Sequence, residues 1–345
     1  MGKPKVYIHR AEEWYSRYLC EADIEKLSQY ADVVNEKDRK VPLSEEELIE
    51  RLDGVEIILS LNGLGVQDFT PNVIRAMAKS VRYVYIAHWW NIHNSFVPMC
   101  KDAGITVVEG SNMNTVAVAE WTLGAILFGR RRINTFNERL KSGNEWGAPR
   151  LCADMVYGST IGLVGLGRIG RYVAQVVQLL GAKVIAYDMI SADAMQAFGI
   201  EKVSLEKLFE TSDVISLHLP VTQQTTGIIG ADLFERIKDD VLFINSARAA
   251  LCDENAMISA LKKNRFTAFL DVFQTEPLPL SSPLRKMDNV IITPHIAGDN
   301  RAMFKAAGSD TIDSIIQYLA DGKVINKQYE TVFHNIENLP RYIQG

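Results

Sequence analysis

Short apolar runs alternate with amphipathic stretches along most of this chain. In its first third, four apolar runs predict strands at residues 6–9, 55–61, 81–87 and 105–109. Two helices are predicted between them, because Ser44 and Glu47 form a capping box and Pro71 suits the first position of a helix. Strands that alternate with helices predict a parallel sheet with helical crossovers.

The rest of the chain repeats this alternation. A long helix is predicted over residues 114–131, because Ala119, Leu123 and Ile126 share one helical face. Six further strands are predicted at residues 160–164, 183–188, 213–217, 241–246, 267–272 and 290–293. Most are continuous apolar runs, which is typical of strands covered by helices on both faces. A last helix is predicted over residues 302–319.

Composition narrows the class of protein. A chain of 345 residues is long enough for two domains. Its net charge of -5 provides no basic surface for nucleic acid or for an acidic membrane. The N-terminus lacks the apolar core of a signal peptide, and no apolar stretch is long enough to span a bilayer. We therefore expect neither a nucleic-acid partner nor a membrane partner.

The cysteines bear on metal binding and on the cellular compartment. Cys20, Cys100, Cys152 and Cys252 lie far apart in the sequence and include no CxxC pair. This spacing argues against a metal site and favours free thiols in a reducing compartment. We expect a cytoplasmic protein without a bound metal.

The strongest local signal is a glycine-rich turn after the apolar run at residues 160–164. Gly165, Gly167 and Gly170 form a GxGxxG pattern, and an amphipathic helix follows. The first glycine permits a tight turn, the second lets the backbone approach a pyrophosphate, and the third allows close packing of helix on strand. The helix start offers free N–H groups and a positive dipole to phosphates. This context disfavours the alternative, a strand–turn–helix that binds nothing.

Asp188 ends the next predicted strand, at about the distance from the turn that dinucleotide-binding domains have. Its carboxylate can accept hydrogen bonds from both ribose hydroxyls, and its charge would repel a 2′-phosphate. Met189, Ile190 and Ser191 follow, so this segment holds no arginine for that phosphate. The sequence therefore predicts NAD rather than NADP as the cofactor.

Polar residues follow the later predicted strands, at the edge where doubly wound sheets bind ligands. Arg248 comes after the strand at residues 241–246, and His295 comes after the last strand. Asp271 belongs to the strand between them, which leads to Glu276. A guanidinium, an imidazole and a carboxylate at one edge are suited to proton transfer on a bound acid.

Five segments together resemble the D-isomer-specific 2-hydroxyacid dehydrogenases. They are residues 161–170, 217–220, 245–248, 270–279 and 293–298, and they follow one another in the order of that family. Two shorter stretches, residues 104–107 and 118–120, also match. The resemblance covers most of residues 80–325. It implies specificity for the D isomer and a homodimer built around the nucleotide-binding domains.

The resemblance implies a role for each polar residue, and side-chain chemistry supports these roles. His295 resembles the general acid of keto-acid reduction and the general base of the reverse reaction. Glu276 resembles the carboxylate that keeps this imidazole charged and oriented. Arg248 resembles the clamp for the substrate carboxylate, and its guanidinium can also polarise the keto oxygen. Asp271 resembles the residue that holds the nicotinamide carboxamide.

Further cofactor contacts follow from the same resemblance. His218 and Pro220 resemble a wall of the cofactor cleft. The remaining predicted contacts are Arg168, Ile169, Ala247 and Gly298. Each of three residues also has a structural alternative to its functional role. His218 could cap a strand, Glu276 could be part of an ordinary turn, and Arg248 could be a surface charge.

One segment departs from the family pattern. Where the family has a glycine-rich turn that binds the substrate carboxylate, residues 87–91 of this chain read AHWWN. Trp89 is a candidate wall of the substrate pocket. His88 is a candidate positive contact, with a structural role as an equal alternative. Asn62 and Gly63 are weaker candidates for substrate contacts. Because the segment at residues 87–91 departs from the family pattern, the sequence does not identify the keto acid.

Together these observations predict two doubly wound α/β domains. A Rossmann NAD-binding domain, residues 113–298, is inserted into a flavodoxin-like substrate domain made of residues 1–112 and a returning helix at residues 299–330. Residues 331–345 are predicted to form a tail. The predicted protein is an oxidoreductase that transfers a hydride between NAD(H) and a small 2-hydroxy or 2-keto acid.

Two rival functions are weighed against this prediction. The first is an NAD-sensing binding protein of the corepressor type with little turnover, which can retain the same arginine, glutamate and histidine. Such proteins typically carry longer disordered extensions than the tail of this chain. The second is a formate-oxidising relative, and that branch has an amide at the position of Glu276.

Overall fold

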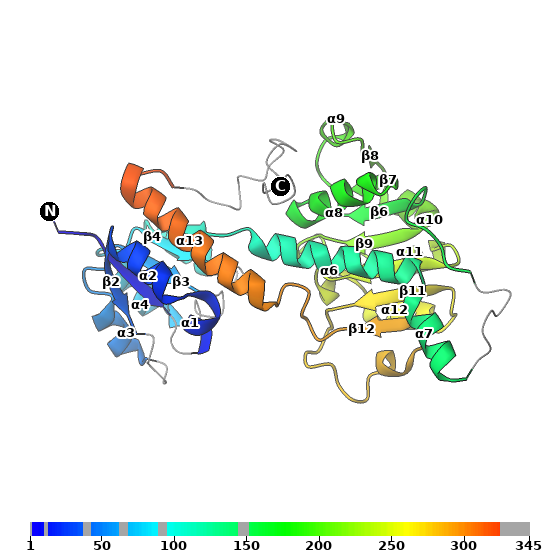
Figure 1. The fold of residues 1–345 in the computed structure, drawn as a ribbon, viewed down its shortest axis with the longest axis horizontal. Helices are drawn as coiled ribbons and strands as arrows, with labels where there is room; N and C mark the ends of the chain where they lie inside the picture. The colour runs from blue at the N-terminus through cyan, green and yellow to red at the C-terminus, as the bar shows by residue number, and fades with distance from the viewer. Residues whose placement is uncertain are drawn as a thin grey trace. The chain divides into compact units, whose positions relative to one another are not determined.

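The chain divides into two units in its computed structural model, which describes residues 2–9, 13–36, 43–61, 68–88, 95–143 and 152–324. Unit 1 comprises Met1–Asn114 and Asp299–Gly345, and unit 2 comprises Thr115–Gly298. Each unit has a parallel sheet with helices on both faces (Figure 1). The predicted fold class, two doubly wound α/β domains, is confirmed.

The sheet of unit 1 has the strand order β2-β1-β3-β4-β5, and each neighbouring pair is parallel. The strands are β1 (Lys5–His9), β2 (Asp32–Asn35), β3 (Ile57–Ser60), β4 (Tyr83–Ile86) and β5 (Thr106–Glu109). This is the flavodoxin-like order, in which the chain reverses direction across the sheet between β1 and β3. The sequence pattern does not predict β2, because this edge strand is short and only partly buried.

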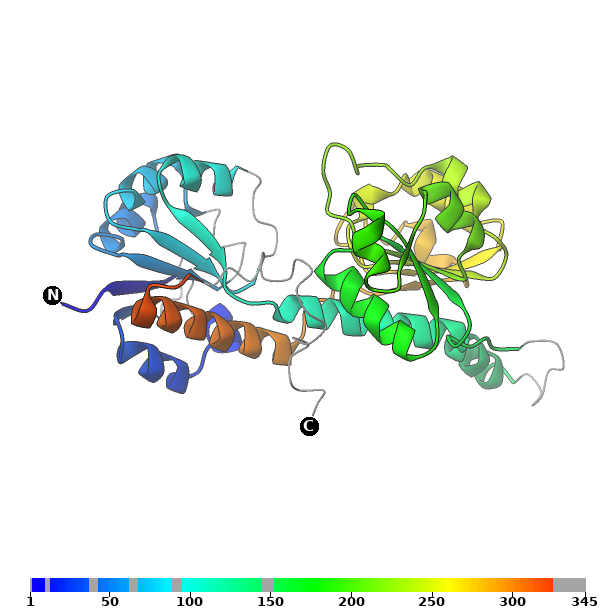
Figure 2. The ribbon, with the colours of Figure 1, turned by 90° about the horizontal axis from the view of Figure 1, so that it is seen from above.

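Helices cover both faces of this sheet (Figure 2). One face carries α3 (Glu45–Arg51), α4 (Pro71–Met77) and α5 (Phe96–Asp102). The other carries α1 (Glu13–Tyr18), α2 (Glu21–Ser28) and α13 (Arg301–Asp321). The capping box of Ser44 with Glu47 and the N-terminal proline of α4 are both confirmed. The sequence pattern misses α1, α2 and α5.

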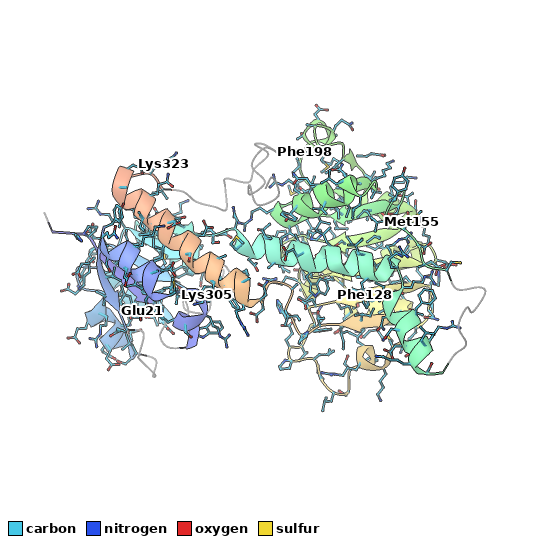
Figure 3. All side chains as sticks on the ribbon, viewed as in Figure 1. Glu21, Phe128, Met155, Phe198, Lys305 and Lys323 are labelled. Atoms are coloured by element: carbon cyan, nitrogen blue, oxygen red, sulfur yellow. The ribbon has the colours of Figure 1, made fainter. Side chains whose placement is uncertain are left out.

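Helix α13 comes from the far end of the chain and completes unit 1. The ammonium group of Lys305 donates hydrogen bonds to the carbonyls of Ser16 at 2.8 Å and Leu19 at 2.9 Å (Figure 3). Gly308 lies directly against α1, since a Cβ there would be 2.1 Å from the carbonyl oxygen of Tyr18. The docking of α13 therefore depends on a position without a side chain.

The sheet of unit 2 has the parallel order β12-β11-β10-β9-β6-β7-β8. The strands are β6 (Thr160–Val164), β7 (Lys183–Tyr187), β8 (Glu201–Lys202), β9 (Val214–Leu217), β10 (Val241–Asn245), β11 (Phe266–Leu270) and β12 (Val290–Ile292). This is the Rossmann order, and the strand order reverses between β6 and β9. All six strands predicted for this part are present, whereas β8 is too short to give a sequence signal.

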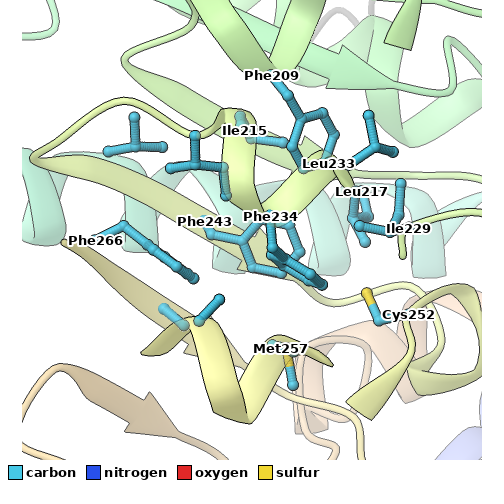
Figure 4. Packing of buried hydrophobic residues seen from close by; sticks show 14 of the residues in the cluster. Phe209, Ile215, Leu217, Ile229, Leu233, Phe234, Phe243, Cys252, Met257 and Phe266 are labelled. Carbon is cyan, nitrogen blue, oxygen red and sulfur yellow. The ribbon is translucent and has the colours of Figure 1, made fainter. Parts of the chain in front are cut away.

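Two helical layers enclose this sheet. One contains α6 (Met113–Arg130), α8 (Arg168–Leu179) and α9 (Ala192–Gln196), and the other contains α10 (Leu205–Thr211), α11 (Ala231–Arg236) and α12 (Glu254–Leu261). The second layer packs through an aromatic cluster in which the rings of Phe234 and Phe243 lie 5.5 Å apart (Figure 4). A further helix, α7 (Ile133–Lys141), follows α6 and buries none of its residues. Among the described helices, none is long and apolar enough to cross a membrane.

Candidate active site

The glycine-rich turn joins β6 to α8, where the strand order of unit 2 reverses. Gly165 has a left-handed φ of 103°, and a Cβ there would lie 2.8 Å from the backbone of His218. A Cβ on Gly170 would lie 2.4 Å from the carbonyl oxygen of Gly165. Gly167 is the N-cap of α8, whose first turn leaves N–H groups without helical partners. These residues fit the pyrophosphate of a dinucleotide.

Asp188 follows β7 and reaches back to this turn. Its Oδ2 accepts a hydrogen bond from the N–H of Leu166 at 2.6 Å, and its Oδ1 accepts one from the N–H of Ile190 at 3.1 Å. The carboxylate is therefore held at the rim of the turn, where a ribose would bind.

Two arginines on α8 add positive charge beside this rim. Arg168 is a predicted contact, whereas the sequence analysis missed Arg171. Burial lowers the pKa of Arg171, and the charge of Asp188 acts in the opposite direction. The spacing of three residues between the two arginines is the signal that identifies them as neighbours on one helix face.

His295 and Glu276 form the central pair of the candidate site. They lie on the loops that follow β12 and β11, two neighbouring parallel strands. The His295 Nδ1 lies 2.7 Å from the Glu276 Oε2, and the other carboxylate oxygen accepts the N–H of Phe273 at 2.9 Å. His295 has a left-handed φ of 55°. Through this contact the Glu276 carboxylate can orient the imidazole of His295.

Arg248 lies on the loop after β10, the next strand of the same sheet. Asn245 shapes this loop, since its amide accepts the N–H of Ala247 and donates to the carbonyl of Arg248, both at 3.0 Å. The Arg248 side chain reaches solvent, but neighbouring atoms desolvate the guanidinium and lower its pKa. The negative charge of Glu276 acts in the opposite direction but only partly offsets this lowering of the pKa.

Asp271, the residue after β11, has no exposed surface. Its carboxylate accepts hydrogen bonds from the hydroxyl of Thr293 and from the N–H groups of Ile296 and Ala297. These hydrogen bonds attach the carboxylate to the loop that carries His295. The predicted contact between Asp271 and the nicotinamide carboxamide stays a prediction.

His218 follows β9 and lies against the glycine-rich turn. Its Nε2 lies 3.0 Å from the hydroxyl of Ser216, and burial lowers the pKa of the imidazole to about 4. A neutral ring of this kind suits a wall of the cofactor site better than a proton donor. Pro220 lies two residues further on and is exposed.

The remaining predicted cofactor contacts lie on two loops of unit 2 and in the first turn of α8. Ala247 and Gly298 are partly exposed, on the loops that also carry Arg248 and His295. Ile169, in the first turn of α8, packs against the core of unit 2.

His88 lies in unit 1, just after β4, and is 5% exposed. Its Nδ1 lies 2.9 Å from the Tyr18 hydroxyl, and its ring packs against Phe304 of α13 at 5.9 Å. Burial lowers the pKa of His88 to about 4, so the ring is neutral at physiological pH. Of the two roles that the sequence left open for His88, this burial and packing favour the structural one.

Three predicted substrate contacts, Asn62, Gly63 and Trp89, lie outside the described residues. Within the described ranges, no group of three histidine, cysteine, aspartate or glutamate side chains is arranged to hold a metal ion. Among the described residues, the candidates Arg248, Glu276 and His295 lie on loops of unit 2.

Comparisons with known proteins identify a family and several relatives to which this chain is similar. The family model for the NAD-binding domain of D-isomer specific 2-hydroxyacid dehydrogenases matches residues 123–297. A glyoxylate reductase of Thermofilum pendens is 33% identical over 307 residues, which are 86% of each chain. A D-3-phosphoglycerate dehydrogenase of Methanocaldococcus jannaschii is 33% identical over 311 residues, 89% of this chain but 57% of that protein.

A solved structure supports the fold. D-mandelate dehydrogenase of Rhodotorula graminis, in its apo form, superposes with a TM-score of 0.77 at 23% identity. The superposition covers 92% of this chain and 94% of the other. At this identity the likeness concerns the fold alone.

Proposed function

The chain belongs to the D-isomer-specific 2-hydroxyacid dehydrogenases, a family with an NAD-binding domain, and we propose that it transfers a hydride between NAD(H) and the α carbon of a small 2-hydroxy or 2-keto acid. The observation that carries this proposal is the 2.7 Å contact between His295 and Glu276 at the carboxyl edge of the unit 2 sheet. The electrostatic influence of Glu276 on Arg248 supports a common site for all three residues.

The glycine-rich turn and Asp188 would hold the dinucleotide, which supplies the hydride for reduction when it is bound. Arg248 binds the substrate carboxylate and polarises the keto oxygen. Because Nδ1 of His295 faces Glu276, the proton for the developing alkoxide comes from Nε2. Glu276 stabilises the imidazolium until that transfer. In the reverse reaction, Nε2 accepts the hydroxyl proton.

The loss of NADH absorbance with a panel of 2-keto acids tests the proposal. The panel comprises glyoxylate, hydroxypyruvate, pyruvate, phenylpyruvate and a branched 2-keto acid. Glyoxylate comes first, because a relative that matches this chain over 86% of both lengths is named a glyoxylate reductase. We expect oxidation of NADH with at least one acid. Tight NADH binding without turnover of any acid would instead favour an NAD-sensing binding protein.

Cofactor preference gives a separate prediction. Replacing Asp188 with Asn is expected to reduce the preference for NADH over NADPH by about 10- to 100-fold, since it removes one charge-assisted ribose contact and the repulsion of a 2′-phosphate. The measurement is the ratio of kcat/KM for the two cofactors. The exposed Asp193 of α9 provides the control, because Asp193→Asn should leave that ratio unchanged. An unchanged ratio in Asp188→Asn would contradict the NAD assignment.

Unit 1 is proposed to be the substrate domain. The carboxyl edge of its sheet ends in His9 and Ser60, and the candidates Asn62, Gly63 and Trp89 follow β3 and β4 in the sequence. The order of the sheet supports this proposal, since flavodoxin-like sheets bind ligands at that edge.

A homodimer is also proposed, built on α6, α7 and the segment after them. Five large apolar side chains in this region, Leu127, Ile133, Leu140, Met155 and Tyr157, are between 45% and 72% exposed. Large apolar side chains that remain exposed on one part of a protein are typical of an interface. Light scattering should give twice the chain mass of 38.6 kDa. Combining Ile133→Glu with Leu140→Glu should give a monomer, and a monomeric wild-type protein at micromolar concentration would contradict the proposal.

The cysteines support a cytoplasmic location as part of this proposal. All four are free, two of them buried. Free thiols suit a reducing compartment.

A further inference from the structure

Asp188 shares the rim of the glycine-rich turn with a positive side chain from α8. Its Oδ2 accepts the N–H of Leu166 at 2.6 Å, and the Nε of Arg171 donates to the carbonyl of Gly167 at 3.2 Å. Leu166 and Gly167 are consecutive residues, so the carboxylate and the guanidinium are both attached to one short stretch of the turn. Burial lowers the pKa of Arg171, and the charge of Asp188 partly offsets this lowering.

A second cation comes from the edge strand of the same sheet. Lys202 lies on β8, where it is the partner of Ala186 on β7. Its ammonium group donates to the carbonyl of Ile190 at 2.6 Å, and the N–H of Ile190 donates to Oδ1 of Asp188 at 3.1 Å. The short segment that begins with Asp188 is therefore attached to a lysine that lies 14 positions further along the chain.

These contacts change what the rim offers to a dinucleotide. A carboxylate after β7 accepts hydrogen bonds from the hydroxyls of the adenosine ribose, and its charge repels a phosphate on the 2′ oxygen. Residues 189–191 contain no cation, but Arg171 and Lys202 bring one each from α8 and β8. Guanidinium and ammonium groups are the side chains that bind phosphate. The rim thus combines an acceptor for ribose hydroxyls with two donors for a phosphate.

We propose that Arg171 and Lys202 are further determinants of cofactor specificity, which bind the 2′-phosphate of NADPH and so offset its repulsion by Asp188. The protein prefers NADH but also accepts NADPH. This inference rests on the proposed function, since it concerns the same dinucleotide site. It assigns the discrimination between the two cofactors to one carboxylate and two cations from separate elements of unit 2.

The binding of NADH and of NADPH, without any substrate, tests the inference, because the two cofactors differ only in the 2′-phosphate. Energy transfer from the tryptophans of the protein to the bound nicotinamide gives both Kd values. We expect the Kd for NADPH to be about 10-fold higher than the Kd for NADH in the wild-type protein. A ratio above about 100-fold would contradict the inference, since the repulsion by Asp188 would then have no counterpart.

Two neutral variants remove the cations one at a time. Arg171→Gln should raise the Kd for NADPH about 10-fold and Lys202→Gln about 3-fold, because each removes a charge-assisted contact with the phosphate. The Kd for NADH should stay within about twofold of wild type in both variants, since the ribose hydroxyls bind Asp188 instead. An unchanged Kd for NADPH in both variants would overturn the inference. An equal rise for both cofactors would do the same, because the cations would then bind the pyrophosphate.

A lysine at the other end of β7 provides the matched control. Lys183 begins this strand, and its ammonium lies 2.7 Å from a carboxylate oxygen of Glu201 on β8. Lys183→Gln removes the same charge as Lys202→Gln but at the amino end of the strand, so the ratio of the two Kd values should stay at the wild-type value. A change as large as that in Lys202→Gln would attribute the effect to net charge rather than to contact, which contradicts the inference.

A double variant separates phosphate binding from simple neutralisation of Asp188. If Arg171 binds the phosphate, Arg171→Gln should still raise the Kd for NADPH about 10-fold in an Asp188→Asn background. Loss of this effect in that background would mean that Arg171 acts only through the carboxylate, and the inference would be wrong.

The same measurements distinguish this inference from the proposed function. If both cofactors bind with the expected ratio but no 2-keto acid is reduced, the proposed function fails and the assignment of the two cations stands. If keto acids are reduced but Arg171→Gln and Lys202→Gln leave the ratio unchanged, the proposed function stands and the inference fails. Binding of neither cofactor would reject both.

Discussion

Replacing His295 with alanine is expected to lower kcat for 2-keto acid reduction by about 1000-fold, with the Kd for NADH within about twofold of wild type. The ring lies on the loop after β12, and three strands of the sheet separate β12 from β6, which leads into the glycine-rich turn. The variant removes the proton donor and leaves the neighbouring carboxylate of Glu276 in place. Stopped-flow measurement of NADH oxidation, with NADH binding followed by fluorescence, gives both quantities.

A second variant separates proton donation from packing at this position. His295→Asn keeps a polar group that can donate to Glu276, but it has no group that exchanges a proton near neutral pH. It should lose as much turnover as His295→Ala. Imidazole added to the buffer should restore part of the activity of the alanine variant, because a small imidazolium can enter the vacated space and donate the proton. Turnover near the wild-type value in either variant would reject His295 as the proton carrier.

Replacing Arg248 with alanine is expected to lower kcat/KM for the keto acid by about 1000-fold. The guanidinium is proposed to make two charge-assisted hydrogen bonds to the substrate carboxylate, each with a contribution of about 1.5–3 kcal/mol. Arg248→Lys keeps the charge without the planar fork, so its loss should be smaller, at about 100-fold. Steady-state kinetics with a saturating concentration of NADH provides the comparison.

The control for this series is an arginine that forms a surface ion pair in the same unit. Arg236 of α11 pairs with Glu210, and both side chains are about half exposed. Arg236→Ala should leave kcat/KM within twofold of wild type, since exposed ion pairs contribute little. If Arg248→Ala weakens NADH binding but leaves the KM for the keto acid unchanged, Arg248 does not bind the substrate.

These predictions concern residues that local sequence patterns point out. The glycine-rich turn, its amphipathic helix and Asp188 lie within one strand–helix–strand unit, so their spacing along the chain reflects their spacing in the fold. Arg248, Glu276 and His295 each follow an apolar strand. Because the carboxyl ends of parallel strands meet at one edge, three separate sequence positions predict one shared edge.

Other features depend on contacts between distant segments of the chain. The periodicity of apolar residues along the sequence does not predict such contacts. Asp271 is apparent in the sequence as a polar residue at a strand end, but its three donors come from a loop more than twenty positions later. His88 follows a strand in the same way, yet Tyr18 and Phe304, from both ends of the chain, enclose it. Neither burial nor hydrogen-bond partners can be derived from the residues beside them.

The amino-acid sequence alone therefore establishes most strands of both sheets, the dinucleotide turn and the list of reactive side chains, because each depends on neighbours within a few residues. Folding in three dimensions decides which of those side chains stay accessible and which are enclosed. The two aspartates show the difference. Asp188 remains partly exposed at the rim of the turn, whereas Asp271 is buried against the loop of His295. The physical reason is that desolvation and hydrogen bonding depend on all atoms around a group, most of which belong to distant parts of the sequence.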